Sequence, residues 1–183
     1  NREAKAAVEL KKAEKRDLRK LKKIYLEAFP KAERKPFWLM KQKALQGKME
    51  LLSIQEKGEP VGLAFMVLYQ DLALLDYFAI AHAYRGKKIG SKALELLKER
   101  YHKQRFLLEI EQVDKAASNN AERIRRKQFY LKNGLHETGI QVSVFQVPME
   151  LLTDGRPLTF EEYYGIYLTS IGLVFARQIK RLP

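Results

Sequence analysis

The sequence predicts a mixed α/β (α+β) protein, with a mostly antiparallel twisted sheet of about seven strands flanked by helices. Two apolar runs, Met49–Gln55 and Val61–Gln70, flank a turn rich in breaker residues, which is typical of an antiparallel hairpin. A third apolar run, Leu72–Ile80, continues the meander. A helical pattern and a further run, Arg105–Val113, then give the strand–helix–strand order of a right-handed parallel crossover. The length of 183 residues suits one domain with a sizeable core.

The chain is expected to begin with a short strand and two helices. We expect the strand over Ala7–Lys12 and the first helix from Glu14, where apolar residues recur at steps of three and four. These residues are Leu18, Leu21, Tyr25 and Phe29. Pro30 ends this helix, and Pro36 is well placed to begin a second helix over Phe37–Leu45.

The stretch from Leu72 to Tyr101 carries the clearest chemical signal. A short polar loop, Arg85–Ser91, joins an apolar strand to a segment with the apolar spacing of a helix. Such a loop presents unpaired backbone N–H groups and the positive end of the helix dipole. Arg85, Lys87 and Lys88 add full positive charges. The pattern indicates an anion site suited to a phosphate or pyrophosphate, and a tight turn with solvated lysines is the alternative.

In the second half, Arg105–Val113 is predicted to be a strand in which Glu109 and Glu111 share one face. A strongly basic helix follows and ends at Asn133-Gly134. A strand over Leu135–Val147, bulged near Gly139, comes next. Because Pro148 disfavours a central strand, we expect residues 149–152 to form an edge partner.

The C-terminal part is predicted to be helical. Thr159 is a good N-cap, and Glu161 and Glu162 in the first turn favour a tyrosine-rich helix. Residues 171–182 suggest a further short helix. We therefore expect one domain over residues 1–152 and a helical extension over residues 153–183 packed on it.

Composition excludes some functional classes and leaves others open. The sequence has no cysteine, and its three histidines lack metal-ligand spacing, so no metal site is expected. No apolar run could span a membrane, and a soluble cytoplasmic protein is the simplest expectation. The formal charge of +13 fits a nucleic acid, an acidic partner or a polyphosphate ligand, or serves solubility alone.

Two motifs in this order of elements resemble the GNAT family of N-acetyltransferases. Residues 77–91 look like the acetyl-CoA-binding motif of that family, with Arg85 and Gly90 at matching positions. Lys88 stands where the first motif glycine usually sits, and either crowds the pyrophosphate or points outward and adds charge. The second motif is a helix that ends in Phe129-Tyr130, followed by Gly134. The resemblance covers roughly residues 7–152.

The resemblance implies a splayed parallel pair of strands at a cofactor cleft, with acetyl-CoA as co-substrate. It implies that the backbone near Phe78 and Ile80 holds the pantetheine arm, while the loop N–H groups hold the pyrophosphate. The implied cofactor-binding residues are Phe78, Ala79, Ile80, Arg85, Gly86, Lys87, Lys88, Ile89, Gly90 and Ser91. Tyr130 matches the tyrosine that many members use as general acid toward the departing thiolate.

The acceptor amine must lose a proton, either to a side chain or through water. Glu109 is our first candidate for the base, and Glu111 and Asp76 are the others. The acceptor itself is left open among small amines, antibiotics, polyamines, peptide N-termini and protein lysines. The helical region Phe29–Leu45 and the segment Gly139–Leu152 are expected to shape the acceptor side, and a homodimer is left open.

Two other hypotheses for the function remain open. The basic helix Arg123–Lys132 and the lysine-rich start of the chain suggest a nucleic-acid or ribosome-associated binding module. No aromatic-interleaved RNA-binding motif accompanies them, which favours the enzyme. The departure at Lys88 also leaves open a catalytically silent relative that binds CoA.

Overall fold

A computed structural model describes residues 7–183 of the chain. The predicted fold class is confirmed: the structure has a mixed α/β fold with one mostly antiparallel sheet flanked by helices. The sheet has eight strands in the order β1-β2-β3-β4-β5-β7-β6-β8. Strands β4 and β5 are its parallel pair. By contact density the chain divides into two compact units. The first contains residues 7–68 and Leu75–His102, and the second contains Tyr69–Leu74 and Lys103–Pro183.

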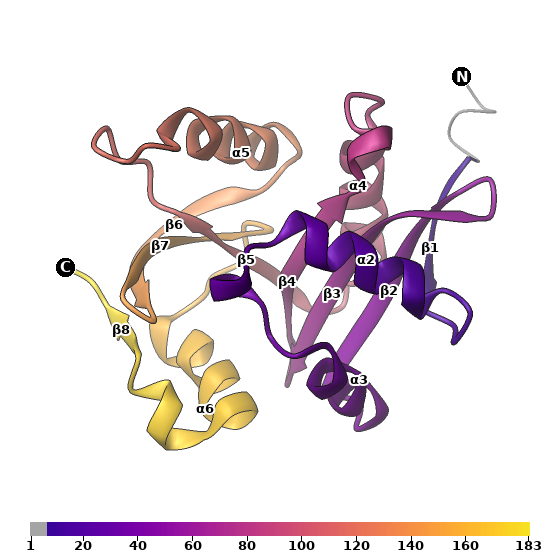
Figure 1. Cartoon of the computed structure of the whole chain (residues 1–183). Helices are drawn as coiled ribbons and strands as arrows, with labels where there is room; N and C mark the ends of the chain where they lie inside the picture. Colours follow the sequence, from indigo (N-terminus) through magenta and orange to yellow (C-terminus); the bar gives the residue numbers. More distant parts are fainter. Residues whose placement is uncertain (1–6) are drawn as a thin grey trace. The chain divides into compact units, whose positions relative to one another are not determined.

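The first unit contains the elements from the start of the described chain to helix α4 (Figure 1). They are β1 (Val8–Lys12), α2 (Leu18–Ala28), η1 (Lys31–Glu33), α3 (Phe37–Leu45), β2 (Met49–Glu56), β3 (Glu59–Tyr69), β4 (Leu72–Ile80), η2 (His82–Tyr84) and α4 (Ile89–Arg100). The last residue of β3 and the first three of β4 belong to the second unit. In Figure 1, α2 and α3 lie in front of these strands and α4 lies behind them.

An aromatic cluster forms the core between α2, α3 and the sheet of the first unit. The Tyr25 and Tyr77 rings meet edge to face, with centroids 4.9 Å apart, and Phe29, Phe37 and Phe65 surround them. Edge-to-face packing brings the positive ring edge to the negative ring face, so it adds stability beyond the buried area. Of the apolar positions predicted for this helix, Leu21 and Tyr25 lie on the buried face of α2, and Phe29 is its C-cap.

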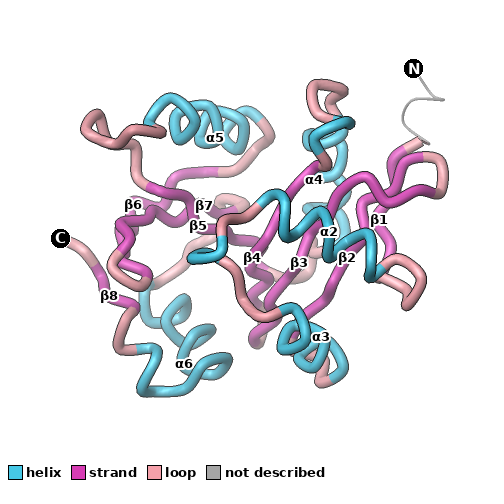
Figure 2. Tube along the Cα trace, viewed as in Figure 1, coloured by secondary structure: helices cyan, strands magenta, loops and turns pink. Residues whose placement is uncertain are grey.

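The second unit contains β5 (Arg105–Glu111), α5 (Asn120–Lys132), β6 (His136–Val144), β7 (Val147–Thr153), α6 (Phe160–Ala176) and β8 (Ile179–Arg181). Figure 2 shows its two helices in cyan on either side of the magenta strands. Thr159 caps α6 as predicted, because its side chain accepts from the Glu162 N–H while the Glu162 carboxylate accepts from the Thr159 N–H.

Arg105 joins three parts of the second unit. Its guanidinium donates to both carboxylate oxygens of Asp71, at 2.8 and 3.0 Å, and also pairs with Glu162. A third donor reaches the Pro157 carbonyl oxygen at 2.9 Å. The planar fork of arginine suits such a shared site.

Three details of the predicted elements are wrong. Helix α2 begins at Leu18 rather than Glu14, because the Asp17 carboxylate accepts from the Glu14 N–H and closes a turn first. Residues 171–182 are not one helix: Gly172, at φ 79° and ψ 168°, interrupts α6. The segment Ile179–Arg181 then pairs with β6 as an eighth strand.

The third error is the place of β7. This strand lies between β5 and β6 and is therefore central, not an edge. Its pairing with β5 covers only Met149–Thr153, so Pro148 precedes the stretch in which a β5-facing N–H would be needed. The Pro148 carbonyl still accepts from the Gln112 N–H at 3.1 Å. The predicted bulge near Gly139 is confirmed by a register shift between Glu137 and Gln141.

Among residues 7–183, none of the helices combines the length and the apolar composition that crossing a bilayer would require.

The Glu50 carboxylate ties β2 to the end of α4 and gives a test of pH-dependent stability. It accepts from the Tyr101 hydroxyl at 2.7 Å and from Arg100 at 3.2 Å, and its side chain is 17% exposed. Burial alone would raise the pKa of Glu50, but these hydrogen bonds outweigh burial and hold that pKa below its usual value. The contribution is therefore complete above the unfolded pKa of about 4.3 and is lost as pH falls through the folded pKa.

We expect Glu50→Gln to lower the free energy of unfolding by on the order of 1 kcal/mol at pH 7. The difference in the free energy of unfolding between Glu50→Gln and the parent should be smaller at pH 3.5, as measured by urea unfolding. Glu9→Gln is the matched control, since Glu9 makes a surface pair with Lys11 and is 58% exposed. An equal loss for Glu50→Gln at both pH values would contradict this account.

Candidate active site

The loop between β4 and α4 has a backbone shape that glycine favours. Gly86 and Lys88 both adopt positive φ, at 78° and 61°. Lys88 is the N-cap of α4 and makes no side-chain capping bond. The first N–H groups of the helix, at Ile89, Gly90 and Ser91, therefore have no partner within the helix. A residue other than glycine in the left-handed region costs about 1 kcal/mol, so the backbone at Lys88 has a conformation in which glycine would be more stable.

The side chains of the loop bring positive charge to these N–H groups. The Arg85 Nε donates to the Ile80 carbonyl oxygen at 3.1 Å, which folds the loop back onto the end of β4. The Lys87 ammonium lies 5.5 Å from the centroid of the Tyr84 ring. Lys87 and Lys88 are both exposed, so the side chain of Lys88 lies at the surface and adds charge. Such a helix start with adjacent cations suits a phosphate group.

A close approach of two strands supports the end of β4. At Gly62 on β3, an added Cβ would lie 2.6 Å from the Ala79 carbonyl oxygen and 2.9 Å from the Ile80 Cδ1. Only glycine fits there without moving the backbone of β4. The sequence analysis did not single out Gly62, although a glycine inside an apolar strand is the signal for a close backbone approach.

Asp76 and Tyr77 anchor the connection between α2 and α3. The Tyr77 hydroxyl donates to the Glu33 carbonyl oxygen at 2.6 Å and accepts from the Lys35 N–H at 3.0 Å. The Lys35 ammonium lies 2.7 Å from the Asp76 carboxylate, and that carboxylate side chain is only 10% exposed. Burial and the nearby Asp76 charge raise the pKa of Tyr77, so its hydroxyl stays protonated and keeps both bonds.

Tyr130, the predicted general acid, lies on α5 in the second unit and is 8% exposed. Its hydroxyl makes no hydrogen bond within residues 7–183. Burial raises the pKa of Tyr130 to about 12, against a smaller opposite effect of Arg126. At neutral pH the hydroxyl is therefore fully protonated and can donate.

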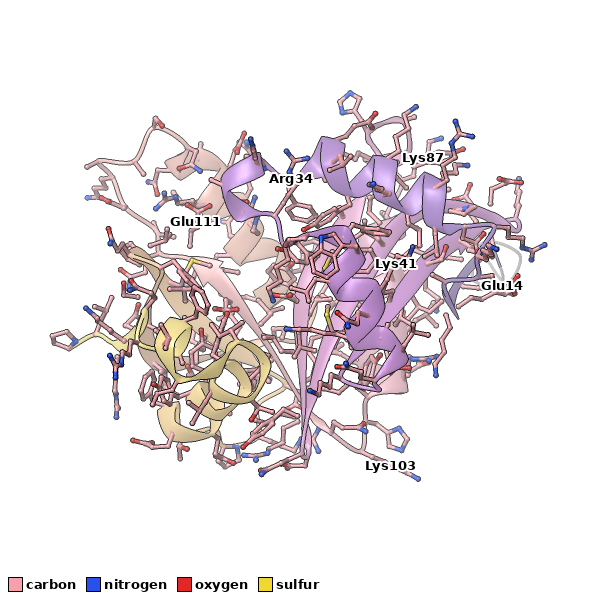
Figure 3. The ribbon with its side chains drawn as sticks, turned by 60° about the horizontal axis from the view of Figure 1, so that its bottom comes forward. Glu14, Arg34, Lys41, Lys87, Lys103 and Glu111 are labelled. Atoms are coloured by element: carbon pink, nitrogen blue, oxygen red, sulfur yellow. The ribbon has the colours of Figure 1, made fainter. Side chains whose placement is uncertain are left out.

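Glu109 and Glu111, the two acids of β5, are held by different helices. The Glu109 carboxylate accepts hydrogen bonds from the hydroxyls of Tyr163 and Tyr167 on α6, at distances of 2.5–2.8 Å. Glu111, labelled in Figure 3, instead pairs with Arg123 at 2.7 Å and Arg126 at 3.6 Å on α5. Cations therefore already engage Glu111, as Lys35 engages Asp76.

Several basic side chains of α5 form ion pairs within the second unit. Besides the two arginines bound to Glu111, Lys127 pairs with Glu150 at 3.0 Å and with Glu137 at 2.5 Å. These cations hold the second unit together, which weakens the case for α5 as a nucleic-acid surface. Among the described residues, no group of three His, Asp or Glu side chains could hold a metal ion.

The structure thus brings the ten predicted cofactor residues together on the first unit, at the end of β4 and the start of α4. Tyr130 and Glu109 lie on the second unit. Sequence reasoning missed Gly62, Lys35 and the two tyrosines that bind Glu109. Tyrosines at helical spacing in residues 160–170 were a visible signal, but nothing in the sequence paired them with β5.

Comparison with known proteins places this geometry in a family. The profile of the Acetyltransferase (GNAT) family matches residues 18–134. A comparison of the sequence with curated proteins gave no match. Among solved structures, the chain is similar to a protein from Bacteroides thetaiotaomicron described as a GNAT-family acetyltransferase. That similarity has a TM-score of 0.72 and 19% identity, and it covers 90% of this chain and 99% of the other.

Two further structures share the fold. Spermidine N-acetyltransferase from Vibrio cholerae, in complex with CoA and spermine, gives a TM-score of 0.60 and 15% identity, over 81% of this chain and 95% of the other. The ribosomal-protein-S18-alanine N-acetyltransferase from Escherichia coli gives a TM-score of 0.56 and 18% identity, over 84% and 99%. The family profile spans more than half of the sequence and includes both motifs singled out from it. The chain therefore belongs to the GNAT family of acetyltransferases.

Proposed function

We propose that this protein transfers an acetyl group from acetyl-CoA to an amine by direct attack. The observation that carries the proposal is the start of α4, where unpaired N–H groups, a left-handed turn and exposed lysines meet at the end of β4. Arg85, Gly86, Lys87, Lys88, Ile89, Gly90 and Ser91 would hold the pyrophosphate of the cofactor. The backbone around Phe78, Ala79 and Ile80 would hold its pantetheine arm.

In the proposed reaction, a neutral amine nitrogen attacks the thioester carbonyl carbon. The new C–N bond forms as the C–S bond breaks, and the amine gives up its surplus proton to a base. The departing sulfur takes a proton from the Tyr130 hydroxyl, which then recovers one from solvent. Glu109 remains our candidate for the base, directly or through a water, with its carboxylate oriented by the hydroxyls of Tyr163 and Tyr167.

The test is transfer of radiolabel from acetyl-CoA to a panel of amines, with CoA binding measured in parallel. Transfer that depends on the protein supports the proposal. A folded protein that neither transfers label nor binds CoA would remove it. The cytoplasmic location, the homodimer and the division at residue 152 stay predictions of the sequence.

Replacement of Tyr130 tests its role as acid. Tyr130→Phe should lower kcat by about 100-fold or more, the usual contribution of a placed acid. Its melting temperature should not fall, because the removed hydroxyl makes no hydrogen bond within the described residues. In the parent, kcat should not fall between pH 7 and 10 through ionisation of Tyr130, because burial raises the pKa of Tyr130 to about 12.

Tyr164→Phe provides the matched control for this prediction, because the Tyr164 ring stacks on Phe160 and its hydroxyl makes no hydrogen bond within residues 7–183. If Tyr130→Phe keeps the parent kcat under conditions where chemistry limits the rate, Tyr130 is not the acid.

Lys88 allows the departure from the family motif to be tested. Because its side chain is exposed, Lys88→Gly should weaken acetyl-CoA binding at low salt by about two- to fivefold, the effect of one surface charge. Lys88→Gln should give a similar loss while keeping the side chain. Calorimetric titration at two salt concentrations measures both. Tighter binding by Lys88→Gly than by the parent would mean that the side chain crowds the pyrophosphate.

A further inference from the structure

The segment that precedes and includes α3 carries a strong excess of positive charge. We call residues 28–48 the basic segment. It contains six lysines and arginines, namely Lys31, Arg34, Lys35, Lys41, Lys43 and Lys48, against one acidic residue, Glu33. Figure 3 labels Arg34 and Lys41, which come from the connection before α3 and from α3 itself. The excess is local, so it affects whatever approaches this part of the first unit.

The basic segment is attached to β4 directly beside the residues proposed to hold the pantetheine arm of acetyl-CoA. The Tyr77 hydroxyl binds backbone groups of Glu33 and Lys35, and Asp76 binds the Lys35 ammonium. Asp76 and Tyr77 immediately precede Phe78–Ile80 on β4. If acetyl-CoA binds there, as the proposed function requires, an acceptor that reaches its thioester passes next to the basic segment.

Most of these charges are available to a ligand. Within residues 7–183, Lys31, Arg34, Lys41 and Lys48 make no ion pair. The Asp76 carboxylate on β4 is already bound to Lys35. Burial first, and then repulsion from Lys35, lowers the pKa of Lys43. A polycationic acceptor would meet repulsion here, whereas an acidic one would be attracted.

Exposed apolar side chains also lie on α3, the helix of the basic segment. Trp38 is 67% exposed and Leu45 is 91% exposed, although both are large and apolar. Such a surface suits an acidic peptide, because the apolar side chains of the peptide can pack on Trp38 and Leu45 while its carboxylates meet the lysines. A small phosphorylated amine would use the charges but not these side chains.

We propose that the acceptor is an amine on an acidic peptide segment, whose carboxylates lie against Lys31, Arg34 and Lys41. This proposal rests on the proposed acetyl transfer, since it names the acceptor class for that reaction. Similarity to a spermidine acetyltransferase concerns the fold, and the charge of this segment disfavours a polyamine as acceptor.

Peptide binding tests the acceptor class without requiring turnover. Three dye-labelled peptides would share their N-terminal residue and apolar positions and carry glutamate, glutamine or lysine at the next polar positions. Fluorescence anisotropy with CoA present should show the glutamate peptide binding about tenfold or more tightly than the glutamine peptide. The preference should fall steeply with salt. Equal binding of the three peptides, or tighter binding of the lysine peptide, would overturn the proposal.

The double variant Lys31→Glu, Lys41→Glu should abolish or reverse the preference while keeping the parent melting temperature, since both side chains are exposed. Lys15→Glu, Lys57→Glu makes the same charge change on two exposed turns and should leave the preference intact. An equal loss in both doubles would show that net charge alone attracts the peptide, and would overturn the site.

Acetylation of the same peptides, and of spermidine and a phosphorylated amino sugar, separates the two proposals. A higher kcat/KM for the glutamate peptide than for the other acceptors supports the acidic acceptor. Faster acetylation of spermidine or the amino sugar overturns the acceptor class but keeps the acetyltransferase. Failure of the chain to bind CoA, with no transfer to any acceptor, is instead a failure of the proposed function.

Discussion

The chemistry of the first unit depends on the backbone geometry at the start of α4. Two residues with positive φ, Gly86 and Lys88, turn the chain sharply from η2 into the helix. This turn leaves the first helical N–H groups without internal partners, at the positive end of the dipole and next to exposed lysines. Ile89 is 2% exposed and fixes the helix to the core, so the start of α4 is held by packing rather than by a side-chain cap.

The neighbouring strand is constrained from both sides. Gly62 allows β3 to approach the backbone at Ala79. On β4, the Tyr77 hydroxyl binds backbone groups of Glu33 and Lys35 and so holds the connection before α3 next to Phe78. The end of β4, the Arg85–Ser91 loop and the basic segment therefore belong to the same compact unit. Asp76 and Tyr77 hold the basic segment to β4, the strand whose end is proposed to bind the cofactor, so the groups proposed for acceptor and cofactor are fixed beside each other.

Much of the fold could be predicted because the controlling signals are local. Two apolar runs around a turn of breaker residues identified the hairpin of β2 and β3. Pro36 identified the start of α3, and Thr159 identified the start of α6. The errors came from tertiary context. Ile179–Arg181 is a strand because β6 offers an edge, and β7 is central because its pairing with β5 begins after Pro148. Neither partner is visible in the local sequence.

The candidate site was predictable to the same degree. The loop residues followed from a short motif, whereas side-chain partners distant in the sequence did not. Glu109 and Glu111 have the same strand period, yet one binds tyrosines and the other arginines. Asp76 looked like a buried acid, and its lysine partner lies 41 residues away. Such pairs depend on how helices pack, and one sequence without its structure carries no record of that.

The most direct test of the central claim is the melting temperature of the protein with and without acetyl-CoA. The parent is compared with the double variant Lys87→Glu, Lys88→Glu, in which both exposed side chains of the loop are changed. At about a hundred times its dissociation constant, the ligand should stabilise the parent by roughly 2.7 kcal/mol, and the shift should be lost in the variant. A parent that melts at the same temperature with and without acetyl-CoA, or a variant that keeps the full shift, would contradict the assignment of the cofactor to this loop.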